Sequence, residues 1–378
     1  MTGDRVESIA TERAAAHEGP WRALCARALE PNVFAEPAFV VNALRHFAPN
    51  RQLRLVLVWR GPPGGRLIGA CVLETPPAPP GLRVARIWRS DQAGLAALAL
   101  DRDEAPAALE ALVDWLARGR PRVLGLLAPA LDAAGPTTAA LAALAGRRKL
   151  RDFGFSQVDR AVLAASTPLA GEFEASLPKK RVKEWRRRMR RLAEAGAVTF
   201  RIASDAAAIE EFLALEARGW KGARRTALGL DAGLAAFTRA MLAAMARDGA
   251  LAIHLLAVDG AAIAAGIVLR AGDRAFYWKT AYDEAYSEYS PGVQLTLALS
   301  RAQLRDAAIG ATDSCAIEGH PMIDRLWPAR LSLVDHVIAT RPGPARALAL
   351  WLAIERTRRR FRESAKRLIN PLLGRKRS

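Results

Sequence analysis

The chain has 378 residues, of which 51% are hydrophobic and 25% charged, a composition of folded proteins that argues against wholesale disorder. This length suits two domains, each able to bury its own core. Neither a run of about 18 apolar residues nor the apolar segment of a secretory signal occurs, so we expect a cytoplasmic protein. Cys25, Cys71 and Cys315 are widely spaced without a C-x-x-C pair, which indicates neither disulfides nor a metal site.

The positive charge is unevenly placed along the chain. The formal net charge of +18 is concentrated in residues 179–191, with nine Lys or Arg against one Glu, and in residues 356–378, with ten against one Glu. The remainder is nearly neutral, whereas a DNA-binding domain more often has a broad basic face. We therefore expect no DNA partner.

The two basic segments each combine charge with apolar residues. In residues 179–191 and just beyond, helical spacing aligns Val182, Trp185, Met189 and Leu192, so the basic side chains of this helix are either solvated or clamp phosphates or an anionic acceptor. In residues 346–378, apolar side chains such as Trp351 alternate with arginines. This basic amphipathic helix or tail either packs on a lobe or makes peripheral contact with an anionic membrane.

The first half reads as an α/β unit after a polar leader. Helical periodicity covers 20–48 with a turn near Pro31, followed by strands at 53–60, 66–74 and 82–89, a helix near 104–118, a strand at 122–128, a helix near 136–149 and a strand at 155–164.

The second half repeats this order. Helices at 179–195, 205–219 and 231–247 precede strands at 250–258, 261–271 and 274–281, a helix at 291–307, a strand at 312–317, a short helix at 320–327 and a strand at 331–339. A tandem duplication explains this repetition.

The predicted fold class is therefore α/β (α+β), with two lobes that each hold a mixed, mostly antiparallel sheet flanked by helices. The expected units are an N-terminal lobe at 1–165, a C-terminal lobe at 166–345 and the tail at 346–378, with the lobes joined near 165–178. Each lobe is expected to have its own sheet, so a single continuous sheet would contradict this arrangement.

One strand-to-helix junction of the second half has the features of an anion site. Ser290 is placed to cap the helix, Pro291 suits its first position, and Gly292 leaves room for a ligand. The amide groups and the dipole at such a junction favour a pyrophosphate, although the same residues also serve for plain capping.

From this junction and the order of elements, the second half resembles the GNAT acyltransferases. More narrowly, the chain is similar to the tandem-GNAT group associated with cellulose and exopolysaccharide biosynthesis, itself similar to the FemAB transferases. The matching sequence segments are LPKKR at 177–181, EARGWKG at 216–222, YD at 282–283, YSPG at 289–292 and DRLWP at 324–328. The usual Gly-x-Gly phosphate loop of the family is absent, and YSPG stands in its place.

The resemblance implies an acyl-CoA co-substrate, held along a splayed strand and at the following helix. The residues implied to bind it are Tyr277, Lys279, Ala281, Tyr289, Ser290, Pro291, Gly292, Val293 and Gln294. Acceptor-side residues would be Trp220, Lys221 and Tyr282. The first half has no such capped junction, so we expect it to shape the acceptor cleft instead.

Direct acyl transfer needs a base, oxyanion donors and an acid. The candidates for the base are Glu216, Asp283 and His320, each of which also has a purely structural interpretation. Amide groups near Tyr277 to Ala281 would serve the oxyanion, and a tyrosine among Tyr282, Tyr286 and Tyr289 would protonate the thiolate or merely pack the loop. No metal-binding, P-loop or serine-hydrolase motif is present.

The resemblance predicts acyl-CoA-dependent N- or O-acylation of a sugar or lipid-linked intermediate of envelope polysaccharide synthesis. Two alternatives stay open: a FemAB-like aminoacyl-tRNA-dependent transferase, and a non-catalytic subunit of a polysaccharide-synthesis complex. A tRNA partner is expected only under the first alternative.

Overall fold

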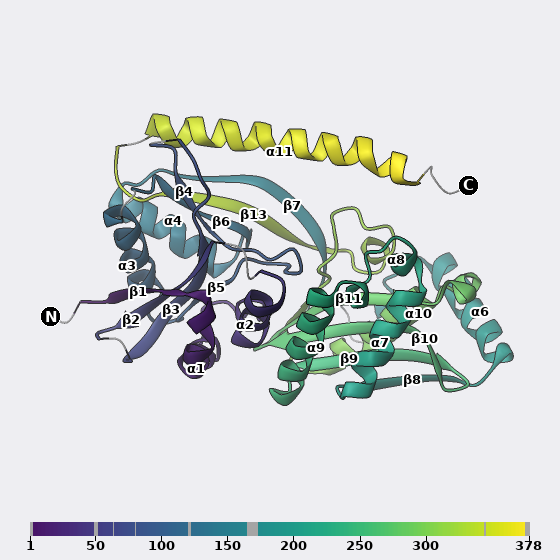
Figure 1. Ribbon diagram of the computed structural model, residues 1–378. Coiled ribbons are helices and arrows are strands. Elements are labelled where there is room, and N and C mark those ends of the chain that lie inside the picture. Colours follow the sequence, from purple (N-terminus) through teal and green to yellow (C-terminus); the bar gives the residue numbers. More distant parts are fainter. Residues whose placement is uncertain are drawn as a thin grey trace.

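The computed structural model describes residues 3–48, 52–62, 64–79, 81–119, 122–164, 173–343 and 345–374. Within them the strands form one mixed sheet, ordered β1-β2-β3-β4-β6-β13-β7-β12-β11-β10-β9-β8, with β5 paired to β3 (Figure 1). Helices flank this sheet on both faces, which confirms the mixed α/β class. The predicted link between lobes at 165–178 lies partly outside the described residues.

The first half contributes its elements in the predicted order. They are β1 (Arg5–Ala10), α1 (Glu18–Cys25), α2 (Pro37–His46), β2 (Leu53–Arg60), β3 (Arg66–Glu74), β4 (Val84–Ile87), β5 (Leu98–Leu100), α3 (Ala105–Arg118), β6 (Gly125–Asp132), α4 (Pro136–Arg148) and β7 (Asp152–Ala164), with short 3₁₀ turns at Thr11–His17 and Val33–Ala35.

The second half repeats the plan with longer central strands. Its elements are α6 (Lys179–Ala195), β8 (Val198–Ala203), α7 (Ala206–Arg218), α8 (Trp220–Ala223), α9 (Ala232–Arg247), β9 (Leu251–Val258), β10 (Ala261–Ala271), β11 (Arg274–Tyr282), α10 (Pro291–Arg305), β12 (Ala311–Asp313) and β13 (Ala329–Ala339), with 3₁₀ turns at Leu228–Leu230, Glu284–Tyr289 and Ile323–Arg325. The helix α11 (Ala345–Gly374) follows.

The two halves exchange their closing strands. β13 belongs to the second half but pairs with β6 of the first, and β7 of the first half pairs with β12 of the second. β7 and β13 also pair with each other, antiparallel, at the centre. The sheet is therefore continuous, and the expectation of two separate sheets was wrong. The closing strand of each half pairs with the other half, so the two repeated units share one sheet while each keeps its own order of elements.

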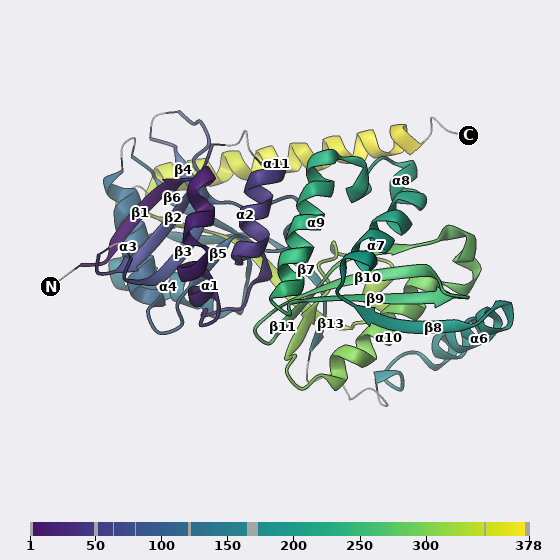
Figure 2. The same ribbon diagram turned by 60° about the horizontal axis from the view of Figure 1, so that its bottom comes forward.

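The halves also share a core. On one face of the sheet, α2 and α9 lie side by side, and the Phe39 ring meets the Phe237 ring edge to face at a centroid distance of 5.3 Å. On the other face, α3, α4 and the start of α11 cover the first half, whereas α10 and α6 cover the second. Figure 2 shows α2 and α9 between the two halves. The contact fixes how the two halves are oriented.

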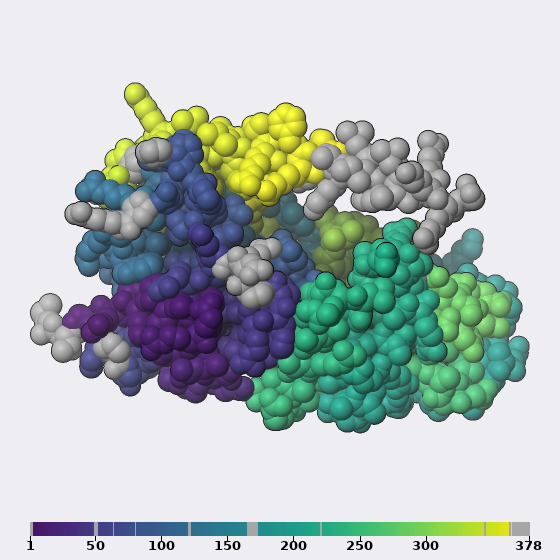
Figure 3. Space-filling view, viewed as in Figure 1, coloured from purple at the N-terminus to yellow at the C-terminus, as the bar shows by residue number. Residues whose placement is uncertain are grey.

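Helix α11 packs on the first half and then continues beyond it. Leu348 and Leu352 are buried, and Arg359 forms ion pairs with Asp335 and Glu355. In Figures 1 to 3 the helix runs along the top of the molecule, from the first half toward the second. The N-terminal part of α11 therefore packs on a lobe, as one of the two interpretations predicted.

Three strands were missing from the predicted elements. β1 and β8 form the two ends of the sheet, and the short β5 pairs with the middle of β3. The polar leader is thus partly strand. The strand expected at 312–317 ends at Asp313, because the chain then turns away to line the site described below.

No single helix in the described residues is long and apolar enough to cross a membrane. The bent pair Lys221–Leu230 and Ala232–Arg247 meets the length and composition together, at an angle of 57°. Its second helix buries Phe237, Met241 and Met245 in the shared core.

Candidate functional site

Strand β11 pairs with β12 only at its beginning, because β12 ends after Asp313 and the chain turns away. Their parallel register covers Arg274 to Phe276 on β11 and Ala311 to Asp313 on β12, whereas β11 continues to Tyr282. Its other edge stays paired with β10 along this length. The predicted splayed strand is therefore present, and its free backbone edge faces an opening.

That opening is a cleft of about 580 Å³. Its lining residues come from α8, β11, the start of α10 and the chain after β12: Lys221, Tyr277, Trp278, Lys279, Thr280, Tyr282, Gly292, Ser314, Cys315, Ala316, Ile317, His320, Pro321, Met322 and Ile323. The cleft thus brings together six predicted site residues, namely Lys221, Tyr277, Lys279, Tyr282, Gly292 and His320. Its size is that of a small-molecule site.

Helix α10 begins at the edge of the cleft, with Pro291 in its first turn as predicted. Ser290 precedes it with a left-handed φ of 55°, and its side chain makes no capping hydrogen bond. Instead, Arg188 Nη1 of α6 donates to Ser290 Oγ at 2.5 Å. A guanidinium therefore adds positive charge at the N-terminus of α10.

Helix α6 is held against α10 and the preceding turn by specific contacts. Gln294 Nε2 donates to the Trp185 carbonyl at 2.8 Å, and Arg191 pairs with Glu288 at 2.6 Å. Arg187 and Arg188 both pair with Glu184, and their hydrogen bonds lower the pKa of that carboxyl to about 2. The basic helix thus packs by its predicted seam, with Arg188 directed to the junction.

Glu216 does not face the cleft as a free base. Its side chain is buried, with one carboxylate oxygen 2.7 Å from Lys221 Nζ and the other accepting from the Leu228 amide at 2.8 Å. Lys221 Nζ also donates to the Thr280 carbonyl at 2.9 Å. The pair therefore fixes α7 and α8 against the splayed strand.

The other two candidate bases have different surroundings. Asp283 accepts from the Ala285 amide at 2.9 Å, a turn-capping role outside the cleft lining. His320 lines the cleft, and its Nδ1 accepts from the amides of Met322 and Ile323 at 3.3 Å. A neutral His320 would then carry its proton on Nε2, which suits a donor better than a base.

Lys279 stands out among the cleft residues. Its Nζ lies 5.3 Å from the centre of the Trp278 ring. Burial and the nearby charge of Lys221 lower its pKa to about 8, against the opposing effect of Glu216. The amine is therefore partly neutral near physiological pH.

The remaining predicted residues whose side chains are described are not among those that line the cleft. Ala281 is buried and paired with Ala265 of β10. Tyr289 lies under the Arg191 guanidinium at 5.7 Å. Pro291, Val293 and Gln294 belong to the first turns of α10. Trp220 begins α8, but its side chain lies outside the described part. All these roles stay predictions.

Several cleft residues escaped the sequence prediction. Trp278 is the extra residue of a bulge in β11, and its indole donates to the Gln92 carbonyl of the first half at 2.7 Å. Cys315 follows β12 with a φ of 51°, and burial raises the pKa of its thiol. The only signal for Trp278 was its place within the splayed strand.

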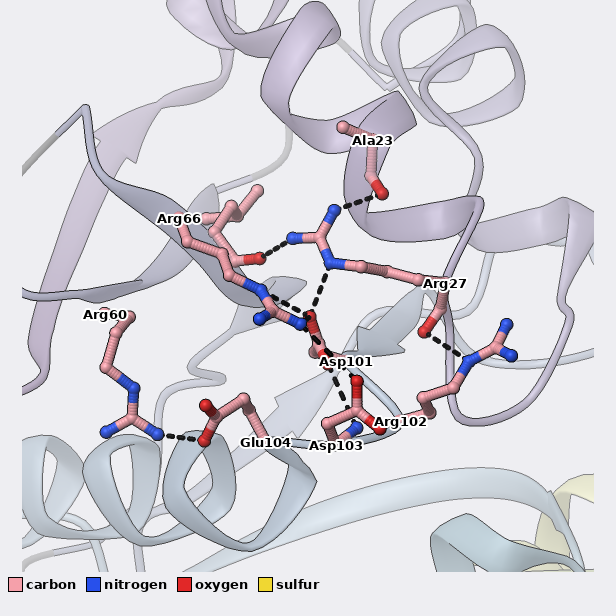
Figure 4. Close-up of polar contacts among 9 residues, drawn as sticks. Ala23, Arg27, Arg60, Arg66, Asp101, Arg102, Asp103 and Glu104 are labelled. Atoms are coloured by element: carbon pink, nitrogen blue, oxygen red, sulfur yellow. Dashed lines mark hydrogen bonds and ion pairs between the residues drawn. The ribbon is translucent and has the colours of Figure 1, made fainter.

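In the described part of the first half, the opening nearest to the end of β6 is much smaller. The gap among β5, the end of β6 and α4 measures only about 20 Å³. Beside it, Asp101 is fully buried and pairs with Arg27 at 2.5 Å and Arg66 at 2.8 Å (Figure 4). The described residues of either half include no group of three His, Cys, Asp or Glu side chains suited to a metal ion.

Comparison with known proteins agrees with this geometry. Residues 179–308 match the family model of the acetyltransferase (GNAT) domain, a span that runs from α6 through α10. No curated protein matches the chain.

Three solved structures resemble the whole fold. FemX aligns with a TM-score of 0.56 at 11% identity, over 88% of this chain and 96% of its own. A conserved protein from Bacteroides thetaiotaomicron aligns with 0.53 at 12%, over 88% and 98%. The C-terminal domain of a protein classed as a lysylphosphatidylglycerol synthetase, from Agrobacterium fabrum, aligns with 0.51 at 14%, over 89% and 95%.

At such identities the structural likeness concerns the fold alone. The matched segment contains α8, the splayed β11 and α10, which line one part of the cleft, whereas the lining residues 314–323 lie beyond this segment. Residues 179–308 therefore resemble the GNAT acetyltransferase domain, and the fold of two halves is similar to that of FemX.

Proposed function

We propose that this protein transfers an acyl group from acyl-CoA to an amine or hydroxyl of a second substrate, within the cleft beside β11. The observation that carries this proposal is the divergence of β11 from β12 next to the start of α10. It offers a free strand edge for the pantetheine amides and a helix N-terminus for the pyrophosphate.

The donor would be held by charge as well as by backbone groups. Gly292 lines the cleft at the first turn of α10, and Arg188 reaches Ser290 from the neighbouring helix. An arginine and a helix N-terminus together suit a pyrophosphate. Tyr282 and Met322 would flank the path of the donor, because both lie near Gly292.

The splayed strand also has a suitable oxyanion donor. The Thr280 carbonyl points away from β10 toward Lys221, and the amide of a strand residue lies on the same edge as its carbonyl. The Thr280 amide therefore faces the opening. It would stabilise the negative oxygen that forms when the acceptor attacks the thioester.

The acceptor is proposed from the resemblance: a sugar or lipid-linked intermediate of envelope polysaccharide synthesis. The indole of Trp278 binds the first half, so an acceptor entering there would contact both halves. The second candidate, an aminoacyl-tRNA-dependent transferase, comes from the FemAB resemblance, and the basic α6 favours it. The third candidate, a non-catalytic subunit, predicts a cleft that turns over no donor.

A thiol-release assay separates these candidates. We expect purified protein to release CoA from at least one acyl-CoA in a panel of chain lengths when sugar or lipid-linked acceptors are added. Transfer from aminoacyl-tRNA without thiol release from any acyl-CoA would favour the second candidate. Binding of acceptors without turnover of either donor would favour the third.

We also propose that α11 places the enzyme against an anionic membrane. Leu350, Ile354 and Phe361 are exposed by 53%, 50% and 73%, and their spacing puts them on one side of the helix. The same helix carries arginines at 356, 358, 360 and 362. Apolar side chains flanked by arginines suit the surface of an anionic bilayer.

A further inference from the structure

The inference concerns how the acceptor loses its proton, and it rests on the proposed function. Among the predicted bases, Glu216 is occupied by Lys221 and the Leu228 amide, Asp283 caps a turn, and His320 accepts two amides. None of the three presents a free lone pair to the cleft. The proton acceptor must therefore be sought among the other cleft residues.

Lys279 has the required position and no counter-ion. It lies on the diverging part of β11 and lines the cleft, yet within the described residues no carboxylate pairs with its ammonium. Glu216 is already used by Lys221. Lys279 is partly buried, and an ammonium removed from water without a carboxylate partner is destabilised relative to the neutral amine.

Three charged or titratable side chains act on Lys279 from neighbouring elements. Glu216 faces it from α7, Lys221 from α8 and Cys315 from the chain after β12. Burial raises the pKa values of the Cys315 thiol and of the neighbouring Tyr277 phenol. At pH 7, a lysine with a pKa of about 8 is neutral in about one-tenth of the molecules.

We propose that Lys279 Nζ is the catalytic base that takes the proton from the attacking amine or hydroxyl. As the acceptor N or O bonds to the thioester carbon, its proton moves to Nζ. Collapse of the tetrahedral intermediate breaks the C–S bond, and the electron pair leaves with the CoA sulfur. The Lys279 ammonium then returns the proton to that thiolate, so acyl ester or amide and free CoA thiol are the products.

The first test measures the amine itself, without any substrate. Trace labelling with acetic anhydride across pH 6–11, read by peptide mass spectrometry, gives the titration midpoint of Lys279. We expect a midpoint near 8, as against about 10.4 for a lysine in a model peptide. A midpoint near 10 would overturn the proposal.

The second test separates a base from an anion-binding cation. Cleavage of acetyl-CoA is followed by thiol release, with water and then ethanolamine as acceptor. Lys279→Met and Lys279→Arg should both lower kcat by about a hundredfold or more and abolish the rise in rate through pH 8. An arginine variant that keeps the wild-type rate would show that Lys279 binds an anion instead.

Two controls keep the outcomes distinct. Lys149→Met changes an exposed lysine of the first half and should leave kcat and its pH profile unchanged. Calorimetry with CoA should give the same affinity for wild type and both Lys279 variants. A wild-type protein that does not bind CoA would contradict the proposed function. The labelling midpoint is measured without CoA and would still decide whether the pKa of Lys279 is lowered.

Discussion

The two halves differ most after the third strand of each three-strand meander. In the second half β11 runs for nine residues and diverges from β12. In the first half β4 has only four residues, and the chain then returns as β5 to pair with β3. The second half therefore keeps a cleft of about 580 Å³, whereas the corresponding gap measures about 20 Å³.

The charged side chains Asp101 and Lys279 differ in the same sense. Asp101 at the end of β5 accepts from Arg27 and Arg66, so its charge is matched inside the fold. Lys279 of β11 has no such partner among the described residues. A buried charge matched by ion pairs supports structure, whereas a partly buried amine without a carboxylate partner beside a cleft is available for chemistry. We therefore call the first half the closed half, because the gap at the end of its β6 is nearly filled, and the second half the open half, because it has a cleft.

The largest effect on CoA affinity should come from filling the cleft of the second half. Gly292→Glu puts bulk and negative charge where the pyrophosphate of CoA would lie, and we expect the affinity for CoA to fall about a hundredfold or more. Calorimetric titration measures this loss, and the melting temperature checks the fold. A folded variant with unchanged affinity would remove the main support for an acyl-CoA donor.

Gly292→Ala is the matched control. A Cβ at this position would lie 3.5 Å from Met322 Sδ and 3.6 Å from Tyr282 Cδ1, which is ordinary van der Waals contact. The alanine variant should therefore bind CoA with nearly wild-type affinity. A large loss in both variants would point to backbone disturbance rather than to charge and bulk in the cleft.

The next effect tests the closed half. Asp101→Asn removes the charge that Arg27 and Arg66 neutralise, and we expect the free energy of unfolding to fall by about 1–3 kcal/mol without a change in CoA affinity. Asp103→Asn makes the same change at an exposed carboxylate and should cost little. Urea denaturation measures both. A folded Asp101→Asn protein that has lost CoA affinity would mean that the first half takes part in donor binding.

The stability contributed by Asp101 should depend on pH. Burial alone would raise the pKa of this carboxyl, but hydrogen bonds from Arg27, the Asp103 amide and Arg66 outweigh it, so the folded pKa lies below the ordinary value. The contribution is therefore complete above about pH 4 and is lost as the pH falls through the folded pKa. Asp101→Asn should show a smaller loss of stability on acidification than wild type.

A smaller effect should separate two adjacent arginines of α6. Arg188→Ala removes the guanidinium at Ser290, and we expect the CoA affinity to fall about tenfold, with a weaker dependence on salt. Arg187→Ala is the control, because Arg187 shares Glu184 with Arg188 but has no contact with Ser290. Equal losses in calorimetry would indicate a diffuse charge effect instead of a specific phosphate contact.

The sequence predicted the open half better than the way the halves join. Proline at the start of α10 and the apolar strand before it indicated the junction from local signals alone. The exchange of β7 and β13 has no local signal, because either apolar strand would complete either sheet. β8 was missed because most of its residues are exposed, so it lacks the alternation of a half-buried strand.

The same limit applies to single site residues. Glu216 was a candidate base because it lies near Trp220 in the sequence. In the structure, Lys221 Nζ and the Leu228 amide donate hydrogen bonds to its two carboxylate oxygens. The basic character of α6 was evident, but only its packing on α10 selects Arg188. Lys279 was predicted to bind the cofactor. Its partly buried amine has no carboxylate partner among the described residues, which depends on neighbours that are distant in the sequence.

The smallest expected effect concerns α11, which is anchored on the closed half. Its buried side, with Leu348 and Leu352, packs on the first half, whereas Phe361, which follows the ion-paired Arg359, is 73% exposed. If the exposed side of α11, which carries Phe361, meets an anionic bilayer, Phe361→Ser should lower the partition onto phosphatidylglycerol-containing vesicles about fivefold. Burying a phenyl group contributes about 1.5–3 kcal/mol, and a helix on the membrane surface gains only part of this free energy. Phe361→Trp should retain binding, since an indole suits the interface equally well. Vesicle sedimentation at low and high salt measures both variants, and neutral vesicles should bind neither. Equal binding of the serine variant and wild type would assign the attachment to the arginines alone, and binding that ignores salt and lipid charge would contradict the membrane proposal.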